Sequence, residues 1–317
     1  MNRRNFVHSS VLVATALPSL SAVTSFGVEA VSGRKFTLAL TPGSIGVSVK
    51  SQRELNDLAY RHGFESVEPR GAEFATMSSE QLEDTLADLA TKKLVWAAAG
   101  LPVDFRKDET LFREGLVGLP TIAAALKKVG VTRMGTWLMP SHGELTYRKN
   151  FDQHVSRLRE VAKILGGHGL NLGLEYVGTQ TLLVGQRYPF LHTFAETREL
   201  ISEIGTGNVG HILDSWHWWT AGDTVEELLT LKNQDIVSVD LNDAPTGLEK
   251  EAQMDNAREL PAATGVIEVA PFLAALREIG YDGPVRAEPF NKVLNALEND
   301  AACAATISAM RKAVDLG

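Results

Sequence analysis

The feature that most constrains the fold is the regular alternation of short apolar segments with amphipathic helical segments from residue 35 to residue 317. The apolar segments span residues 36–40, 64–70, 94–99, 132–139, 170–177, 209–214, 236–243 and 283–290. This alternation predicts a parallel sheet covered by helices. Eight such units close a (β/α)₈ barrel, which typically takes about 250 residues. We therefore expect one α/β domain, a TIM barrel, over residues 31–317.

The first thirty residues have a different character. Arg3 and Arg4 precede an apolar, small-residue run at 11–23, and Ala30 ends a small-residue cleavage site. The run is too short, and too rich in serine and threonine, for a stable membrane span. Paired arginines before such a run are typical of a twin-arginine export signal. We expect residues 1–30 to be this signal and the mature protein to be extracytoplasmic, in the periplasm or beyond.

Charge and composition limit the partners. The chain of 317 residues is 44% hydrophobic and has a net charge of −8. An acidic chain without a basic stripe is unsuited to bind nucleic acid. The single cysteine, Cys303, excludes an internal disulfide, and its apolar helical setting indicates a small buried hydrophobe. The sequence leaves open whether the chain forms a homo-oligomer.

Carboxylates stand at the ends of five of the expected strands. They are Glu68, Glu175, Asp214, Asp240 and Glu288. The active sites of such barrels lie at the carboxyl ends of the strands, where these groups would repel one another unless a cation lay between them. A divalent metal is the simplest such cation. The alternative is that each carboxylate caps a helix or pairs with Arg70, Arg258 or Arg286.

Side-chain alternation along a strand refines this picture. If Asp214 points into the barrel, His211 faces the helices and is a structural histidine. Ser238 and Asn242 share the inward face with Asp240.

Four other side chains near the strand ends bear on the site. Arg286 also points inward and needs a carboxylate partner. His217 follows Asp214 by three residues, and Trp216 offers either an apolar face for a sugar or core packing. His142, in the loop after the fourth strand, is a further pocket candidate.

These motifs together resemble the xylose isomerase-like superfamily of TIM barrels over roughly residues 35–315. The segments that carry the resemblance are Leu174-Glu-Tyr, Leu213-Asp-Ser-Trp-His217, Val239-Asp-Leu-Asn-Asp243, Arg258-Glu-Leu-Pro261 and Gly280-Tyr-Asp-Gly-Pro-Val-Arg-Ala-Glu-Pro289. The superfamily includes sugar isomerases, 3-epimerases, dehydratases and a DNA-repair endonuclease.

The resemblance implies a metal site and a set of substrate contacts. The residues that would hold one divalent ion, Mn²⁺ or Mg²⁺, are Glu175, Asp214, Asp240 and Glu288. Glu175 and Glu288 would also be the catalytic acid and base. The expected substrate contacts are Glu68, His142, Trp216, His217 and Arg258. One departure stands out, because Asp240 occupies a position where the superfamily usually has histidine, and an all-carboxylate set favours Mg²⁺, Mn²⁺ or Ca²⁺ over Zn²⁺.

The implied activity is that of a metal-dependent sugar isomerase or epimerase. It would transfer a proton through an enediolate next to a carbonyl that the metal polarises. A keto-sugar lyase or hydratase begins with the same proton removal and remains an alternative, as does a non-catalytic sugar-binding barrel. A DNA-repair endonuclease would need a histidine-rich site that strands two and three do not supply. Without a basic cluster for phosphate, we expect a neutral small-molecule sugar as the substrate.

Overall fold

The structure, a computed structural model, describes residues 33–317, and residues 34–317 form one compact unit. The predicted export signal, residues 1–30, lies outside the described residues. Among the residues described, no helix combines the length and apolar character needed to cross a membrane.

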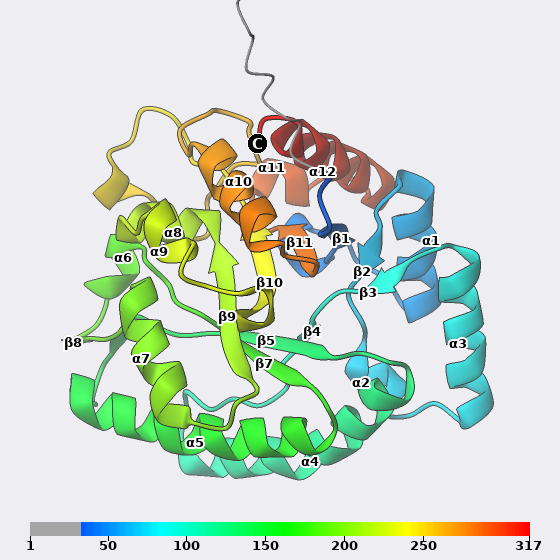
Figure 1. The fold of residues 1–317 in the computed structure, drawn as a ribbon, viewed down its shortest axis with the longest axis horizontal. Helices are drawn as coiled ribbons and strands as arrows, with labels where there is room; N and C mark the ends of the chain where they lie inside the picture. Colours follow the sequence, from blue (N-terminus) through cyan, green and yellow to red (C-terminus); the bar gives the residue numbers. More distant parts are fainter. Residues whose placement is uncertain (1–32) are drawn as a thin grey trace, which may run out of the picture. The chain divides into compact units, whose positions relative to one another are not determined.

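The centre of this unit is a curled parallel sheet, which confirms the predicted (β/α)₈ barrel (Figure 1). Its strands in spatial order are β3 (Val95–Trp96), β2 (Ser66–Val67), β1 (Thr37–Leu40), β11 (Pro284–Ala287), β10 (Ile236–Leu241), β9 (Val209–Asp214), β7 (Asn171–Glu175), β5 (Arg133–Trp137) and β4 (Ala99–Gly100). The expected third strand, 94–99, is interrupted: β3 pairs with β2, and β4 pairs with β5. β3 and β4 are therefore the two edge strands of the sheet, and because they follow each other in the chain, the two edges lie close together.

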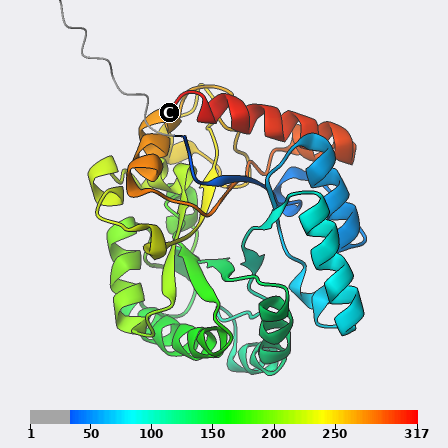
Figure 2. The same cartoon turned by 45° about the vertical axis from the view of Figure 1, so that its right-hand side comes forward.

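Helices surround the strands (Figure 2). The longer ones are α1 (Gln52–His62), α3 (Ser79–Thr91), α4 (Glu109–Lys128), α5 (Tyr147–Gly167), α7 (Phe194–Ile204), α10 (Val269–Ile279) and α12 (Asn299–Val314). Local sequence explains their ends. The Ser51 side chain accepts from the amide of Glu54 to start α1, and Gly63 ends it with φ of 75°. Ser78 and Gln81 form a capping box at the start of α3.

Several short elements modify the simple repeat. They are α2 (Gly71–Phe74), α6 (Gln180–Leu183), α8 (Ser215–Ala221), α9 (Val225–Leu228) and α11 (Lys292–Asn295). The helix expected at 224–231 is reduced to the single turn of α9, preceded by α8, whose capping residue is Asp214. An unpredicted antiparallel pair, β6 (Ser141–His142) and β8 (Tyr188–Pro189), joins the loops that follow β5 and β7.

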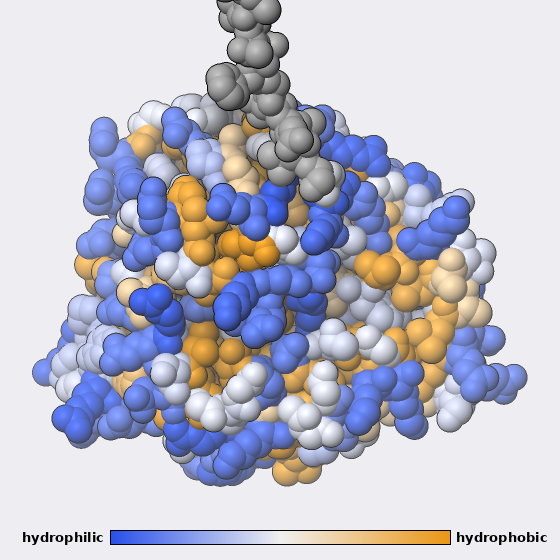
Figure 3. Space-filling view, in the orientation of Figure 1, coloured by the Kyte–Doolittle hydropathy of each residue, from blue (hydrophilic) through white to orange (hydrophobic). Residues whose placement is uncertain are grey.

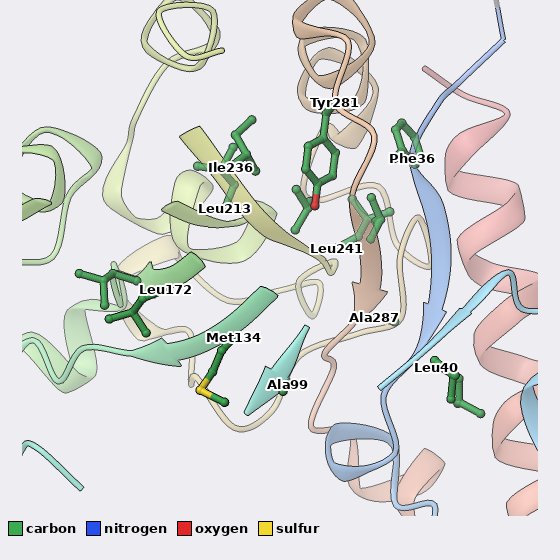
Figure 4. Packing of buried hydrophobic residues seen from close by; sticks show 14 of the residues in the cluster. Phe36, Leu40, Ala99, Met134, Leu172, Leu213, Ile236, Leu241, Tyr281 and Ala287 are labelled. Atoms are coloured by element: carbon green, nitrogen blue, oxygen red, sulfur yellow. The ribbon is translucent and has the colours of Figure 1, made fainter. Parts of the chain in front are cut away.

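One hydrophobic core packs between the strands and the helices (Figure 4). Inside the barrel, Ile212 lies over Gly135 and Gly173, where an added Cβ would come within 2.5 Å and 2.7 Å of it. A Cβ at Gly173 would also lie 2.9 Å from Cβ of Val237, so glycine is favoured most strongly at that position. His211 points the other way and stacks on Phe194 of α7 at 4.8 Å, which confirms the predicted alternation. On the outer face shown in Figure 3, hydrophobic patches are interspersed with hydrophilic side chains.

Candidate active site

A cavity of about 480 Å³ opens at the carboxyl ends of the strands. This volume lies in the usual range for a small-molecule site. One part of its wall carries Glu175, His217, Arg258, Arg286 and Glu288. The other part is mostly small and apolar, and comes from the segment 97–101 and from residues 135–139. The cavity is therefore polar on one side and apolar on the other.

The structure brings four of the predicted carboxylates together. Glu175 ends β7, Asp214 ends β9, Asp240 lies in β10, and Glu288 follows β11. One oxygen from each lies within 4.8 Å of the others. Because the carboxyl ends of neighbouring parallel strands share one edge, residues far apart in the sequence meet here. An all-oxygen set of this kind could hold a hard divalent cation.

Arg258 enters this cluster from the long loop after β10. Its Nη1 donates to Asp214 Oδ2 at 2.7 Å, and its Nη2 donates to Asp255 Oδ1 at 2.8 Å. Nη1 also lies 3.4 Å from Glu288 Oε2. The side chain is only 1% exposed. A guanidinium buried to this degree is stable only with such carboxylate partners.

Arg286 is the second cation in the cluster, and it binds the residue that replaces the usual histidine. It donates from Nε to Asp240 Oδ1 and from Nη2 to Asp240 Oδ2 at 2.7 Å. Nη2 also donates to Glu288 Oε1 at 2.9 Å. The prediction that Arg286 points inward and needs a carboxylate partner is thus confirmed. Both oxygens of Asp240 are already engaged by Arg286.

The two guanidiniums do not balance the carboxylates. Burial, followed by repulsion from Glu288, raises the pKa of Glu175 well above its usual value, and its Oε1 is buried without a hydrogen-bond partner. Burial raises the pKa of Glu288 to about 8 and that of Asp214 to about 6, against the opposing effects of Arg286 and Arg258. A divalent cation would relieve this repulsion and supply the partner that Glu175 lacks, so the residues fit a metal.

His217 lies beside the cluster as a neutral ring. Burial and the charge of Arg258 lower its pKa to about 3. Its Nδ1 lies 3.2 Å from the amide nitrogen of Gly178, and its Nε2 lies 3.2 Å from Nη2 of Arg258. Nε2 lies 3.7 Å from oxygens of both Asp214 and Asp255. His217 also lines the cavity, next to Arg258.

Asn242 fixes two of the carboxylates. Its Nδ2 donates to Asp214 Oδ1 at 2.9 Å, and its Oδ1 accepts from the amide of Glu288 at 2.8 Å. This agrees with the inward orientation predicted for Asn242. The contacts link β9, β10 and β11 and hold their ends in register.

Three of the predicted substrate contacts are not among the residues that line the cavity. Trp216 is fully buried, donates to Thr179 Oγ1 and lies under the Arg258 guanidinium at 5.3 Å. Its indole therefore supports Arg258 from behind. The ring of His142 accepts from the amides of residues 144 and 145, within its own loop. Glu68 lies near Arg286 and Asp240, and burial raises its pKa.

Two charged residues of the site were not predicted from the sequence. Asp255 lies in the irregular loop before Arg258 and bonds to it. Arg106 lies in the loop after β4 and lines the apolar part of the cavity. Neither residue ends a strand, so the search for polar strand ends could not find them.

In TIM-barrel enzymes the active site lies at the carboxyl ends of the strands. The cavity and the carboxylate cluster of this chain lie at the same end of its barrel. The chain belongs to the xylose isomerase-like TIM barrel family, whose model matches residues 57–313. This confirms the resemblance found in the sequence.

Individual relatives agree with this placement. The chain is 27% identical to the inosose isomerase of Bacillus velezensis over 245 residues, which cover 74% of this chain and 81% of the relative. A xylose isomerase domain protein from Alicyclobacillus acidocaldarius superposes with a TM-score of 0.77 at 30% identity, covering 89% of this chain and 99% of that one. The IolI protein, solved with a zinc atom, has a TM-score of 0.72 at 21% identity, with 88% and 98% covered. The relatives support a sugar-modifying enzyme.

Proposed function

We propose that the protein is a sugar isomerase or epimerase that uses a divalent metal, Mn²⁺ or Mg²⁺. The observation that carries the proposal is the cluster of four carboxylates within 4.8 Å of one another, two of which, Glu175 and Glu288, line a small-molecule cavity. The similarity to an inosose isomerase and the zinc of the IolI protein support it. The oxygen-only donor set favours Mn²⁺ or Mg²⁺ over Zn²⁺ in this chain.

The four carboxylates would hold the ion, with unequal contributions. Glu175 Oε1 has no partner among the described residues, whereas both oxygens of Asp240 accept from Arg286. Asp240 is therefore the weakest of the four ligands. A bound divalent ion polarises a carbonyl and makes the neighbouring C–H more acidic. Proton transfer and substrate contacts would come from side chains.

Glu175 and Glu288 would transfer the proton. Their strands, β7 and β11, are separated in the sheet by β9 and β10, so the two carboxyl groups approach a bound carbon from different sides. One carboxylate takes the proton from the carbon next to the carbonyl, and the C–H electron pair forms the double bond of an enediolate. The other carboxyl group returns a proton to the opposite face, which inverts or relocates the stereocentre. His217 and Arg258, which line the same cavity, would contact a substrate oxygen.

Hydrogen exchange tests this proposal directly. Purified protein would be analysed for bound metal, then incubated with Mn²⁺ and a panel of ketoses and inososes in deuterated water. We expect deuterium to enter at a carbon next to the carbonyl, and Glu175→Gln and Glu288→Gln each to slow exchange by about 10²-fold or more. The exposed Glu298→Gln is the matched control. NMR of the products separates an epimer or isomer from the dehydrated product of a lyase.

Two outcomes would contradict the proposal. Full metal occupancy without exchange on any sugar would indicate a sugar-binding barrel. Failure to bind Mn²⁺, Mg²⁺ or Zn²⁺ at all would reject the carboxylate cluster as a metal site.

A further inference from the structure

The apolar part of the cavity wall contains one cation, Arg106, that the proposed mechanism does not use. Arg106 lies between β4 and α4, and its side chain is 22% exposed. Its guanidinium stacks on the rings of Trp137 at 4.3 Å and Phe105 at 4.6 Å. Flat contacts on two aromatic faces leave little freedom, so the guanidinium is held in a fixed orientation.

The hydrogen bonds of the Arg106 guanidinium use only one of its three nitrogen atoms, Nη1. Nη1 donates to the carbonyl of Trp137 at 2.6 Å and to Thr136 Oγ1 at 3.1 Å. For Nε and Nη2, no acceptor within hydrogen-bond distance occurs among residues 33–317. The nearest carboxylate, that of Asp104, is 3.9 Å from Nε and lies closer to Lys107, at 3.1 Å.

The other two arginines of the cavity differ in this respect. Arg258 bonds to Asp214 and Asp255, and Arg286 bonds to Asp240 and Glu288. The positive charge of Arg106 alone lacks a carboxylate at hydrogen-bond distance among the cavity-lining arginines of the described chain. Because the Arg106 side chain is 22% exposed, its two unbonded nitrogens are accessible to a ligand that enters the cavity. Burial also lowers the pKa of Arg106, as expected for a charge without a close partner.

Arg106 lies within reach of a molecule bound at the carboxylates. The carbonyl that it holds belongs to Trp137, whose Cα is the register partner of Glu175 on the adjacent strand. Adjacent strands are about 4.8 Å apart. A ring-sized molecule in the cavity can therefore contact both Glu175 and Arg106.

We propose that Arg106 binds a carboxylate of the substrate, so that the substrate is an acidic sugar derivative such as a uronate or a carbocyclic hydroxy acid. The free Nε and Nη2 form the fork that matches the two oxygens of a carboxylate. A phosphate would require more donors, and no lysine lines the cavity within the described part of the chain. This replaces the neutral sugar expected from the sequence. The inference rests on the proposed function only in taking this cavity as the substrate site.

Paired ligands test the proposal by isothermal titration of the full-length, Mn²⁺-loaded protein. The pairs are D-glucuronate with D-glucose, D-galacturonate with D-galactose, and quinate with myo-inositol. We expect at least one acid to bind about tenfold or more tightly than its neutral partner. Arg106→Leu should abolish that preference without weakening the neutral compound, and Arg106→Lys should keep part of it. Arg187→Leu, which removes an exposed arginine stacked on Tyr188, is the matched control.

The remaining outcomes overturn the proposal. They are equal binding of acid and neutral partner, absence of binding for all three acids, and an equal loss for both partners in Arg106→Leu. The last would mark Arg106 as structural, and the melting temperature of Arg106→Lys gives an independent check. Failure of the isomerase proposal has a different signature, since acids would still bind in an Arg106-dependent way while no C–H exchange occurred.

Discussion

Arg286 donates hydrogen bonds to both carboxylate oxygens of Asp240, and its Nη2 also reaches Glu288 at 2.9 Å. A fixed positive charge thus lies inside the carboxylate cluster, in contact with Asp240, the residue that stands where the resemblance leads one to expect a histidine ligand. Each of these two side chains neutralises the charge of the other. Asp240 can be buried because Arg286 neutralises its charge, and Arg286 can point inward because Asp240 accepts hydrogen bonds from its Nε and Nη2.

The first prediction concerns this pair. Asp240→Asn leaves Arg286 without its main partner, and breaking a buried pair on one side costs about 3–5 kcal/mol. The partial exposure of Arg286, 24%, makes the expected loss smaller than that range. Chemical denaturation of Asp240→Asn, Arg286→Met and the double variant measures it. We expect the double variant to lose less than the two single variants together, whereas strict additivity would show that the pair is not coupled.

The second prediction is that Glu175 lowers the stability of the folded, metal-free protein. Its carboxyl is buried, its Oε1 has no partner, and it faces Glu288. Glu175→Gln removes the charge at nearly constant volume. We therefore expect the metal-free variant to melt at or above the temperature of the wild type, while its affinity for Mn²⁺ in calorimetry falls. A lower melting temperature would show that Glu175 stabilises the fold.

The third prediction concerns pH and follows from Glu288. Its folded pKa of about 8 lies above the ordinary value of 4.5, so the folded chain binds this proton more tightly than the unfolded chain. The resulting stabilisation is complete below pH 4.5 and is lost as pH rises to about 8. Metal-free protein should therefore lose stability over this window in denaturation experiments.

Added metal should reverse the trend of the third prediction. Mn²⁺ competes with protons for Glu288 and Asp214, so its affinity should increase with pH up to about 8. The rise in melting temperature on adding Mn²⁺ should be larger at pH 8 than at pH 5. Equal rises at both pH values would contradict the assignment of Glu288 as a ligand, and Ca²⁺ and Mg²⁺ titrations would show whether the effect depends on the ion.

The fourth prediction concerns the first thirty residues. If Arg3 and Arg4 belong to a twin-arginine signal, replacing both with lysine should retain the protein in the cytoplasm. Cell fractionation of the wild type and the double variant, in a bacterial host with this export system, measures the effect. The matched control is Lys50→Arg, an exchange of the same kind at an exposed site in the mature chain. Unchanged export of the double variant would reject the twin-arginine route.

The sequence by itself determined the barrel and most of its acidic site. Strand and helix periodicities are local, and the strand ends of a (β/α)₈ barrel meet at one place, so Glu175, Asp214, Asp240 and Glu288 could be grouped from their positions alone. The alternation of side chains also placed Arg286 inside and His211 outside.

Tertiary structure decided which charges pair and which do not. Arg258, Asp255 and Arg106 lie in loops without a repeating pattern, so their directions depend on contacts far away in the chain. Only the folded chain shows which carboxylates Arg258 and Arg286 bind, that Trp216 lies behind Arg258, and that Arg106 lines the cavity. The strands of the barrel fix where the site lies, and the loops add charged side chains such as Arg106, Asp255 and Arg258. We therefore expect the loop residues to decide which ligand the site binds.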